Sequence, residues 1–232
     1  MENKFLNRKS LKKIFLFGIL LFLLIEYFSI PSYSIQLLKN KNPGKTALMR
    51  QRIKESDGKI KINQRWVSLT RISPHLIHAI IVAEDGTFFE HGGIDWYEVQ
   101  ESIEKNIEEG RAARGASTIT QQLAKNLYLS TSKDPLRKIK ELIITLRMER
   151  YLKKNRILEI YLNVIEFGEG IFGVESAARK YFGKSSAELD RYESARLAAI
   201  IPSPLKHSPV ENSRWLNYRT NIILNRMEAR GW

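Results

Sequence analysis

The sequence has no cysteine, and this absence removes several kinds of chemistry. Disulfides, thiolate nucleophiles and thiolate metal ligands are all excluded over its 232 residues. Histidine is scarce as well, with four residues and no HExxH-type spacing, so a dedicated zinc site is not expected. The glycine patterns of a P-loop, a dinucleotide-binding turn and a G-x-S-x-G nucleophile turn are also missing. We therefore expect neither thiol chemistry nor a nucleotide-binding loop.

Strand-like sequence and acidic residues are in short supply too. No alternating run of Val, Ile or Thr exceeds a few residues, whereas helical periodicity recurs along the chain. The 38 Lys and Arg outnumber the 25 Asp and Glu, which gives a net charge of +13. A mainly α fold is therefore expected. Its partners should be acidic: nucleic acid, anionic lipid headgroups or phosphate-bearing substrates.

An apolar run near the N-terminus predicts a membrane anchor. Residues 1–13 form a basic tail, and residues 14–30 are apolar apart from Glu26 and Ser29, which lie near one end. Pro31 ends the predicted helix. A cleaved signal peptide is the competing interpretation, but no Ala-x-Ala-like site follows the run. We expect an uncleaved single-pass anchor with the basic tail in the cytoplasm and the remaining chain outside.

The rest of the chain divides into a connector and one domain. Residues 31–63 are basic and polar, with a turn signal at Asn42-Pro43-Gly44 and one helix expected near Thr46–Glu55. The lysines of this connector suit anionic headgroups, although a solvated linker is an equally good interpretation. Residues 64–232 contain the apolar helices, and Ser73-Pro74 has the form of an N-cap followed by proline.

The first of these helices leads into two adjacent carboxylates, Glu84 and Asp85. Paired aromatic residues follow at Phe88 and Phe89, and then His91. A carboxylate between a buried helix and an aromatic pair is partly desolvated, which raises its pKa and suits it to act as a general base. We assign that role to Glu84, a supporting role to Asp85 and a turn-fixing role to His91. The alternative is a pair of surface charges at a helix end.

A second helix is expected to begin after Ser117 or Thr118 and to carry an unusual polar face. Successive residues of a helix are about 100° apart, so one face collects Thr118, Gln121, Gln122 and Lys125. A hydroxyl, two amides and an ammonium with no acid beside them suit sugar hydroxyls and a phosphate. The alternative is an ordinary solvent-exposed face.

A long helix is expected from Pro135 onward. Glu141 lies beside Arg137 and Lys138, whose charges keep the carboxylate ionised. An ordinary surface pair, stabilising by roughly 0.3 kcal/mol, is the alternative. The side chains expected to form the core stripe of this helix, opposite Glu141, are Ile139, Leu142, Ile143 and Leu146.

Together these stretches resemble one family, the peptidoglycan glycosyltransferases (transglycosylases) of glycosyltransferase family 51. The first family motif, E-D-x-x-F-x-x-H-x-G, matches residues 84–93, and the second matches residues 114–126 throughout. Further motifs follow in the family's order, in the form found in its monofunctional members. They match or resemble residues 137–141, 157–163, 168–182 and 195–202.

The resemblance implies a lysozyme-like, mainly α domain with a smaller membrane-facing jaw, preceded by one transmembrane helix. It implies polymerisation of lipid II into linear glycan strands. In that reaction the 4-hydroxyl of an acceptor N-acetylglucosamine attacks a muramyl group carried on undecaprenyl pyrophosphate, with inversion. The expected location is the inner membrane, with the domain on the periplasmic side.

The resemblance also assigns site residues. Glu84 matches the general base, and Glu141 matches a second carboxylate near the donor's pyrophosphate. Lys133 stands where some members carry arginine. The residues expected to bind substrate are Asp85, Phe88, His91, Arg114, Ser117, Thr118, Gln121, Gln122, Lys125, Asn126, Lys133, Arg137, Lys138 and Lys140.

The expected partners are lipid II, the growing lipid-linked glycan, the membrane and other cell-wall synthesis proteins. Nucleic acid is not expected, because the anchor directs the domain away from it. No cofactor is expected to be required, although a divalent cation, Mg²⁺ or Mn²⁺, is compatible with the pyrophosphate.

Two other functions fit parts of the sequence: a lysozyme-like peptidoglycan hydrolase and a non-catalytic, membrane-anchored cell-wall scaffold. The density of cations argues against the hydrolase. The coexistence of Glu84, Lys125 and Glu141 argues against the scaffold.

Overall fold

The structure is a computed structural model that describes residues 8–29, 32–110, 115, 117–129 and 135–232. It is mainly helical, which confirms the expected fold class and fits a lysozyme-like domain. Its elements are α1 (Arg8–Ser29), α2 (Ser32–Leu37), α3 (Ala47–Glu55), β1 (Asn63–Gln64), the 3-10 turn η1 (Leu69–Arg71), α4 (Pro74–Glu84), α5 (Trp96–Glu108), α6 (Ile119–Tyr128), α7 (Pro135–Tyr151), α8 (Lys154–Val164), β2 (Glu166–Gly168), β3 (Ile171–Phe172), α9 (Val174–Phe182), α10 (Arg191–Ala199) and α11 (Arg214–Glu228).

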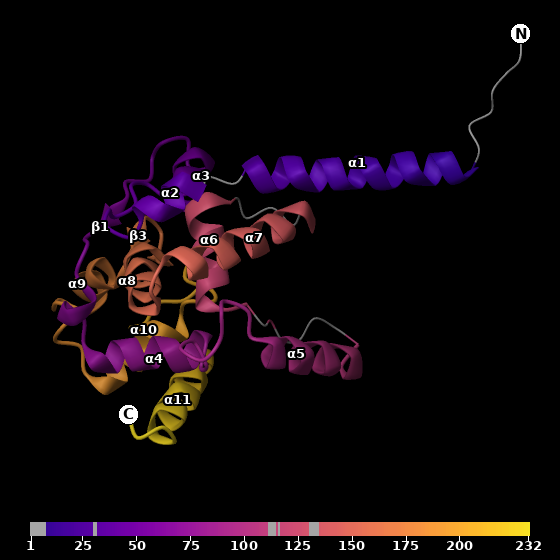
Figure 1. Ribbon diagram of the computed structural model, residues 1–232. Helices are drawn as coiled ribbons and strands as arrows, with labels where there is room; N and C mark the ends of the chain where they lie inside the picture. Colours follow the sequence, from indigo (N-terminus) through magenta and orange to yellow (C-terminus); the bar gives the residue numbers. More distant parts are fainter. Residues whose placement is uncertain (1–7, 30–31, 111–114, 116, 130–134) are drawn as a thin grey trace, which may run out of the picture.

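Helix α4 packs into the core of the fold and ends at the candidate base. It packs against α10 and α11 on one side of the domain, while α6 packs against α7 and α8 on the other (Figure 1). Because α4 is apolar on nearly all sides, its side chains enter a single large core. Leu76 and Ile80 of α4 are fully buried there, as are Leu123 of α6 and Tyr161 of α8.

The start of α4 agrees with the sequence, but its predicted cap does not form. The helix begins at Pro74, whose missing N–H is no loss at this position. The hydroxyl of Ser73 donates to the Leu189 carbonyl at 2.8 Å instead of capping the helix. The Ser73 N–H donates to the Ser186 carbonyl at 3.0 Å. Ser73 therefore ties α4 to the segment that precedes α10.

A small sheet joins the connector to the domain. Its strand order is β1-β3-β2, with β1 parallel and β2 antiparallel to β3. Leu48 and Met49 of α3 pack on Phe172 in a second, smaller core. Arg52 of α3 donates to both carboxylate oxygens of the buried Glu166, each at 2.8 Å. The connector is thus attached to the domain by apolar contacts and by a bidentate ion pair.

Helix α1 extends away from the rest of the molecule (Figure 1). The large apolar side chains of α1 whose burial the structure describes, between Leu11 and Phe28, are exposed. Lys12, Lys13 and Glu26 also fall within it. Among the described residues, no helix is both long enough and apolar enough to span a bilayer, so the transmembrane span predicted at residues 14–30 is not shown.

Helix α5 also projects from the body (Figure 1), and its apolar stripe does not enter the core. Trp96, Ile103 and Ile107 are exposed, and Ser102 is the residue that α5 buries. In the sequence, Trp96, Val99, Ile103 and Ile107 recur at helical spacing over residues 95–109, which predicts a helix, and the structure confirms it. The spacing could not show whether the apolar face meets the rest of the chain.

The predicted core face of α7 is confirmed only in part, because Ile143 packs against the core and Leu142 is half-buried. Ile139 and Leu146 are 41% and 48% exposed, whereas Glu141 is 3% exposed and lies on the buried face with Ile144 and Met148. Glu141, Ile144 and Met148 each lie two residues after a predicted core position. Two residues are more than half a turn of helix, so these side chains point to nearly the opposite face. Burial of the carboxylate is tolerated because two cations of the same helix pair with it.

The turn before α9 gives a stability prediction. Gly173 has φ 80° and ψ 150°, a conformation almost restricted to glycine, and an added Cβ would lie 2.6 Å from the Asn163 carbonyl oxygen. Gly173→Ala should therefore lower the free energy of unfolding by about 3 kcal/mol or more in urea denaturation.

Gly183→Ala is the matched control. Gly183 has φ 70°, but a Cβ there would meet no atom within 4 Å. This substitution should cost only about 1–2 kcal/mol. Equal losses for the two variants would show that the close backbone approach at Gly173 has no energetic consequence.

Candidate active site

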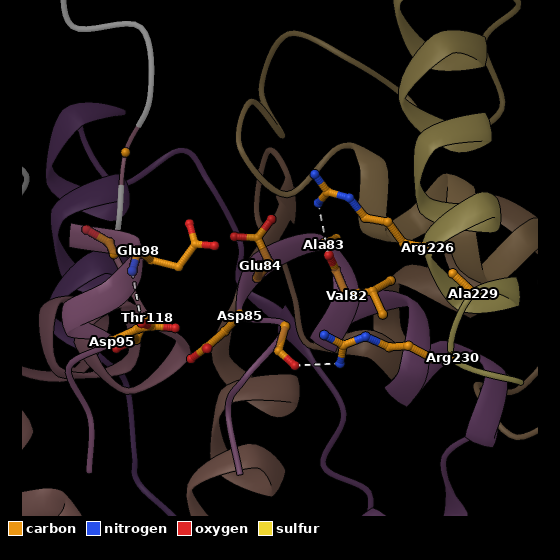
Figure 2. A pocket seen from close by; sticks show the side chains of 13 residues that line it. Val82, Ala83, Glu84, Asp85, Asp95, Glu98, Thr118, Arg226, Ala229 and Arg230 are labelled. Carbon is orange, nitrogen blue, oxygen red and sulfur yellow. Dashed lines mark hydrogen bonds between the residues drawn. The ribbon is translucent and has the colours of Figure 1, made fainter. Parts of the chain in front are cut away.

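A cavity of about 460 Å³ opens at the C-terminal end of α4. Its walls include Asp95, Glu98 and Thr118 on one side and Arg226 and Arg230 on the other (Figure 2). Glu84 lies between these two groups. The cavity therefore has an acidic wall, a basic wall and the candidate base in the middle.

Glu84 is the last residue of α4, is half-buried and is held by a neutral amide. Gln122 of α6 donates to Glu84 Oε2 at 2.7 Å. The carbonyl oxygen of the same amide accepts a hydrogen bond from the Tyr161 hydroxyl at 2.9 Å. Gln122 thus joins the carboxylate to a fully buried phenol, and this connection fixes the orientation of the amide.

Desolvation controls the ionisation of this group. Burial raises the pKa of Glu84, and the Gln122 hydrogen bond and the charges of Arg219 and Lys125 offset only part of the rise. Burial, followed by the charges of Glu84 and Asp85, raises the pKa of Tyr161 well above its usual value. Tyr161 therefore remains a hydrogen-bond donor, and Glu84 is a stronger base than a solvated carboxylate.

Asp85 faces away from Glu84 and holds two segments together. Its Oδ2 accepts the Ile119 N–H, at the start of α6, at 2.9 Å, and its Oδ1 is 2.9 Å from His91 Nε2. The Gly93 N–H donates to His91 Nδ1 at 3.0 Å, so Nε2 carries the proton and donates to Asp85. The Thr118 hydroxyl then donates to the Gly93 carbonyl at 2.7 Å. This network fixes the turn after the base against α6.

The beginning of α6 shows a capping box. Thr118 Oγ1 accepts the Gln121 N–H at 3.2 Å, and Gln121 Oε1 accepts the Thr118 N–H at 2.9 Å. Gln121 and Asn126 are both buried. Of the predicted polar face, Gln122 and Lys125 are the half-buried members, while Thr118 and Gln121 are engaged in the helix start.

Glu141 lies in a cluster of cations at the start of α7. Arg137 donates to Glu141 Oε2 at 2.8 Å, and Lys138 donates to Oε1. Lys138 also reaches the exposed Ser117 hydroxyl at 3.5 Å. Burial lowers the pKa of Lys125, while the charges of Glu141 and Glu84 act in the opposite direction. The ammonium of Lys125 therefore lies in the electrostatic field of both candidate carboxylates.

The remaining predicted residues have other surroundings. Phe88 is fully buried, with the Phe89 ring 5.0 Å away edge-on and the Lys154 ammonium 4.5 Å from its centroid. It is therefore a core residue of this turn. Lys140 is half-buried on α7. Arg114 and Lys133 lie outside the described residues.

Sequence reasoning missed three arginines of the C-terminal segment. Arg219 and Arg226 are seven residues apart on one face of α11, and Arg230 follows just after the helix ends. Burial lowers the pKa of Arg219, and the negative charge of Glu84 opposes that effect. The other two line the cavity. The spacing of these arginines was the available signal in the sequence. No sequence feature showed which part of the fold they contact.

The described residues contain no group of three or more His, Asp or Glu side chains arranged to hold a metal ion. The site instead has two carboxylates in different surroundings. Glu84 is desolvated and bonded to an amide, while Glu141 is bonded to cations. Such a contrast suits Glu84 to accept a proton and Glu141 to hold the neighbouring cations.

Comparison with known proteins identifies the family of the chain. A family model described as transglycosylase matches residues 50–228. The chain belongs to the transglycosylase family. A biosynthetic peptidoglycan transglycosylase of Janthinobacterium sp. is 44% identical over 226 residues, covering 96% of each chain. Proteins of the same name from Nitrosospira multiformis and Dechloromonas aromatica are 48% and 47% identical over 191 residues, covering 81% of this chain and 83% of theirs.

The ionisation of Glu84 gives a prediction about stability. Because burial raises its pKa, the folded protein binds this proton more tightly than the unfolded chain does. The folded state therefore loses stability as the pH rises from the unfolded pKa through the folded one, and the loss is complete above the folded pKa. Glu84→Gln removes this ionisation and should raise the melting temperature at about pH 7.5.

The control for this prediction is the pH dependence of the difference in melting temperature between Glu84→Gln and the wild type. Near pH 4 or below, both states of the wild-type protein hold the proton, so the two melting curves should converge, as thermal unfolding at several pH values would show. A variant that melts at or below the wild-type temperature at neutral pH would contradict the desolvation of Glu84.

Proposed function

We propose that this protein is a peptidoglycan glycosyltransferase that polymerises lipid II into linear glycan strands. The observation that carries the proposal is the half-buried Glu84, held by Gln122 beside a cavity with cations nearby. The names of the related proteins from three organisms support it. Peptidoglycan synthesis takes place at the cell envelope, which is the location that the proposal implies.

In the proposed reaction, the 4-hydroxyl of an acceptor N-acetylglucosamine gives its proton to Glu84. The oxygen attacks the anomeric carbon of an N-acetylmuramyl group, and the bond from that carbon to undecaprenyl pyrophosphate breaks. The pyrophosphate leaves with the electron pair. A single displacement inverts the anomeric carbon. The raised pKa of Glu84 favours proton removal from the hydroxyl in the transition state.

The leaving pyrophosphate needs positive charge, and the α6–α7 region supplies it. We assign Lys125, Arg137, Lys138 and Lys140 to this task, with Glu141 as the carboxylate that holds two of them in place. Preorganised cations at a developing charge lower the barrier without a reorganisation cost. Arg114 and Lys133 remain predictions for the same region.

No cofactor enters the proposed reaction. Mg²⁺ or Mn²⁺ bound to the pyrophosphate itself would supply further positive charge to the leaving group. The protein groups assigned above would then act beside that ion and not as its ligands.

We further propose that the protein works at the membrane surface, in the inner membrane with residues 64–232 on the periplasmic side. The exposed apolar side chains of α1 and α5 support this proposal, because contiguous exposed apolar surface favours a lipid or protein neighbour. In this arrangement α5 belongs to a small membrane-facing jaw, and other cell-wall synthesis proteins are its expected neighbours.

Glu84→Gln tests the proposed base. The amide is close in size and can still accept a hydrogen bond from Gln122, but it cannot take a proton. Polymerisation of labelled lipid II, followed by gel separation of the glycan strands, should fall by about 10²–10⁴-fold. Glu108→Gln, at an exposed carboxylate of α5, is the control and should retain activity. Near-wild-type polymerisation by Glu84→Gln would refute the assignment.

The same preparation distinguishes the alternative functions. Wild-type protein is incubated with lipid II and, separately, with preformed glycan. Longer strands from lipid II support the polymerase. Shortened glycan would identify a hydrolase, and binding without turnover would identify a scaffold.

The membrane proposal has its own test. The double variant Leu16→Asp/Leu20→Asp places two charges on exposed apolar positions of α1, one turn apart. Cosedimentation with phospholipid vesicles should fall strongly, because burying a charge in lipid is costly. Leu205→Asp/Val210→Asp, at two exposed apolar residues outside α1, should bind as the wild type does. Equal binding by both double variants would contradict a membrane role for α1.

A further inference from the structure

Helix α4 ends in an unfavourable way for a helix. Its last turn contains no basic residue, and Asp85 rather than glycine follows it. Two carboxylates, Glu84 and Asp85, stand at the negative end of the helix dipole, where cations would be favoured. The last carbonyls of any helix also lack partners from within the helix. Support for this end must come from elsewhere in the chain.

The C-terminal segment supplies that support through two arginines. Arg226 donates to the Val82 carbonyl at 3.1 Å, and Arg230 donates to the Gly86 carbonyl at 2.5 Å (Figure 2). These carbonyls lie two residues before and two residues after Glu84. The backbone that carries the proposed base is therefore held on both sides by cations of one neighbouring segment.

Gly86 leaves room for the contact with Arg230 because it has no side chain. A Cβ on Gly86 would lie 2.9 Å from Arg230 Nη2 and 3.7 Å from the guanidinium carbon, and no further contact within 4 Å comes from the part of the chain that the structure describes. Its φ is not positive, so alanine adds no backbone strain at this position. Among the described residues, an added methyl would displace the guanidinium of Arg230 and no other group.

The end of the chain keeps Arg230 in place. The Trp232 ring stacks on His78 of α4, with centroids 4.2 Å apart and planes 18° apart. The Trp232 N–H donates to the Met227 carbonyl at 2.9 Å, and the guanidinium of Arg230 lies 5.5 Å from the Trp232 ring centroid. The segment after α11 is thus folded back onto α4.

We propose that Arg230 is a positioning residue for Glu84. It fixes the turn that starts at Asp85 through the Gly86 carbonyl and thereby holds the Glu84 carboxylate at its place in the cavity. The inference rests on the proposed role of Glu84 as the base. It predicts that loss of the contact lowers kcat, because a misplaced base removes the proton less efficiently in the bound complex.

The test uses the full chain and approaches the contact from both partners. Arg230→Ala and Gly86→Ala should each lower kcat for lipid II polymerisation by about 5- to 30-fold, with KM changed less than twofold. The double variant should be no worse than the more impaired single variant, because both changes remove one interaction. Arg230→Lys retains a donor for the carbonyl and should recover most of kcat. Arg214→Ala, at an exposed arginine at the start of α11, is the control and should keep wild-type kcat.

Amide hydrogen exchange provides a readout that does not depend on activity. The Asp85 N–H donates to the Ile81 carbonyl at 2.9 Å, and the Phe88 N–H donates to the Asp85 carbonyl at 3.0 Å. In Arg230→Ala these two amides should exchange faster, while amides of α10 remain unchanged. This measurement stays valid even if Glu84→Gln proves active, so failure of the proposed base and failure of the positioning contact are told apart.

Two results would overturn the positioning role. A rise in KM with unchanged kcat and unchanged exchange would make Arg230 a direct substrate contact, which its place at the cavity wall would allow. If the losses of kcat caused by Gly86→Ala and Arg230→Ala added fully in the double variant, the two residues would act separately.

Discussion

The site depends on the two hydrogen bonds that the carboxylate of Asp85 accepts. This carboxylate joins the first N–H of α6 to the ring of His91, and His91 in turn receives the N–H of Gly93. The turn after Glu84 and the helix that carries Gln122 are therefore fixed to each other through one side chain. Charge-assisted hydrogen bonds of this kind are about twice as strong as neutral ones. This geometry sets where Gln122 meets Glu84.

Glu84 is placed where a carboxylate is costly. It is half-buried, stands at the negative end of a helix and has a neutral amide as its hydrogen-bond partner. Burial and the helix dipole disfavour the ionised form and strengthen the group as a base, and the hydrogen bond from Gln122 offsets only part of that effect. The neighbouring Asp85, one residue later, has two donors and a structural task. Adjacent carboxylates of the same chemical type thus acquire different roles from their surroundings alone.

The sequence predicted helices well and their faces less well. The start of α4 at Pro74 and the start of α6 after Thr118 follow from local capping chemistry, which adjacent residues determine. The predicted buried face of α7 was wrong at Ile139 and Leu146 because apolar periodicity cannot anticipate a carboxylate buried with its own cations. The stripe of α5 was recognised, but its exposure depends on how distant elements pack. Arg226 contacts α4 and Arg230 contacts the turn after it, and each contact joins residues that are 144 positions apart in the sequence. Local sequence patterns therefore cannot predict them.

The separation between base and supporting cations has a physical reason. A lysine or arginine four residues before Glu84 on α4 would pair with its carboxylate directly and keep its pKa low. Cations that bind the flanking carbonyls instead offset the helix dipole and fix the backbone without neutralising the carboxylate. The charge of Arg219 does reach Glu84, but burial still outweighs it and the pKa remains raised. Support from a second helix therefore allows the end of α4 to be stable in its backbone while its last side chain stays reactive.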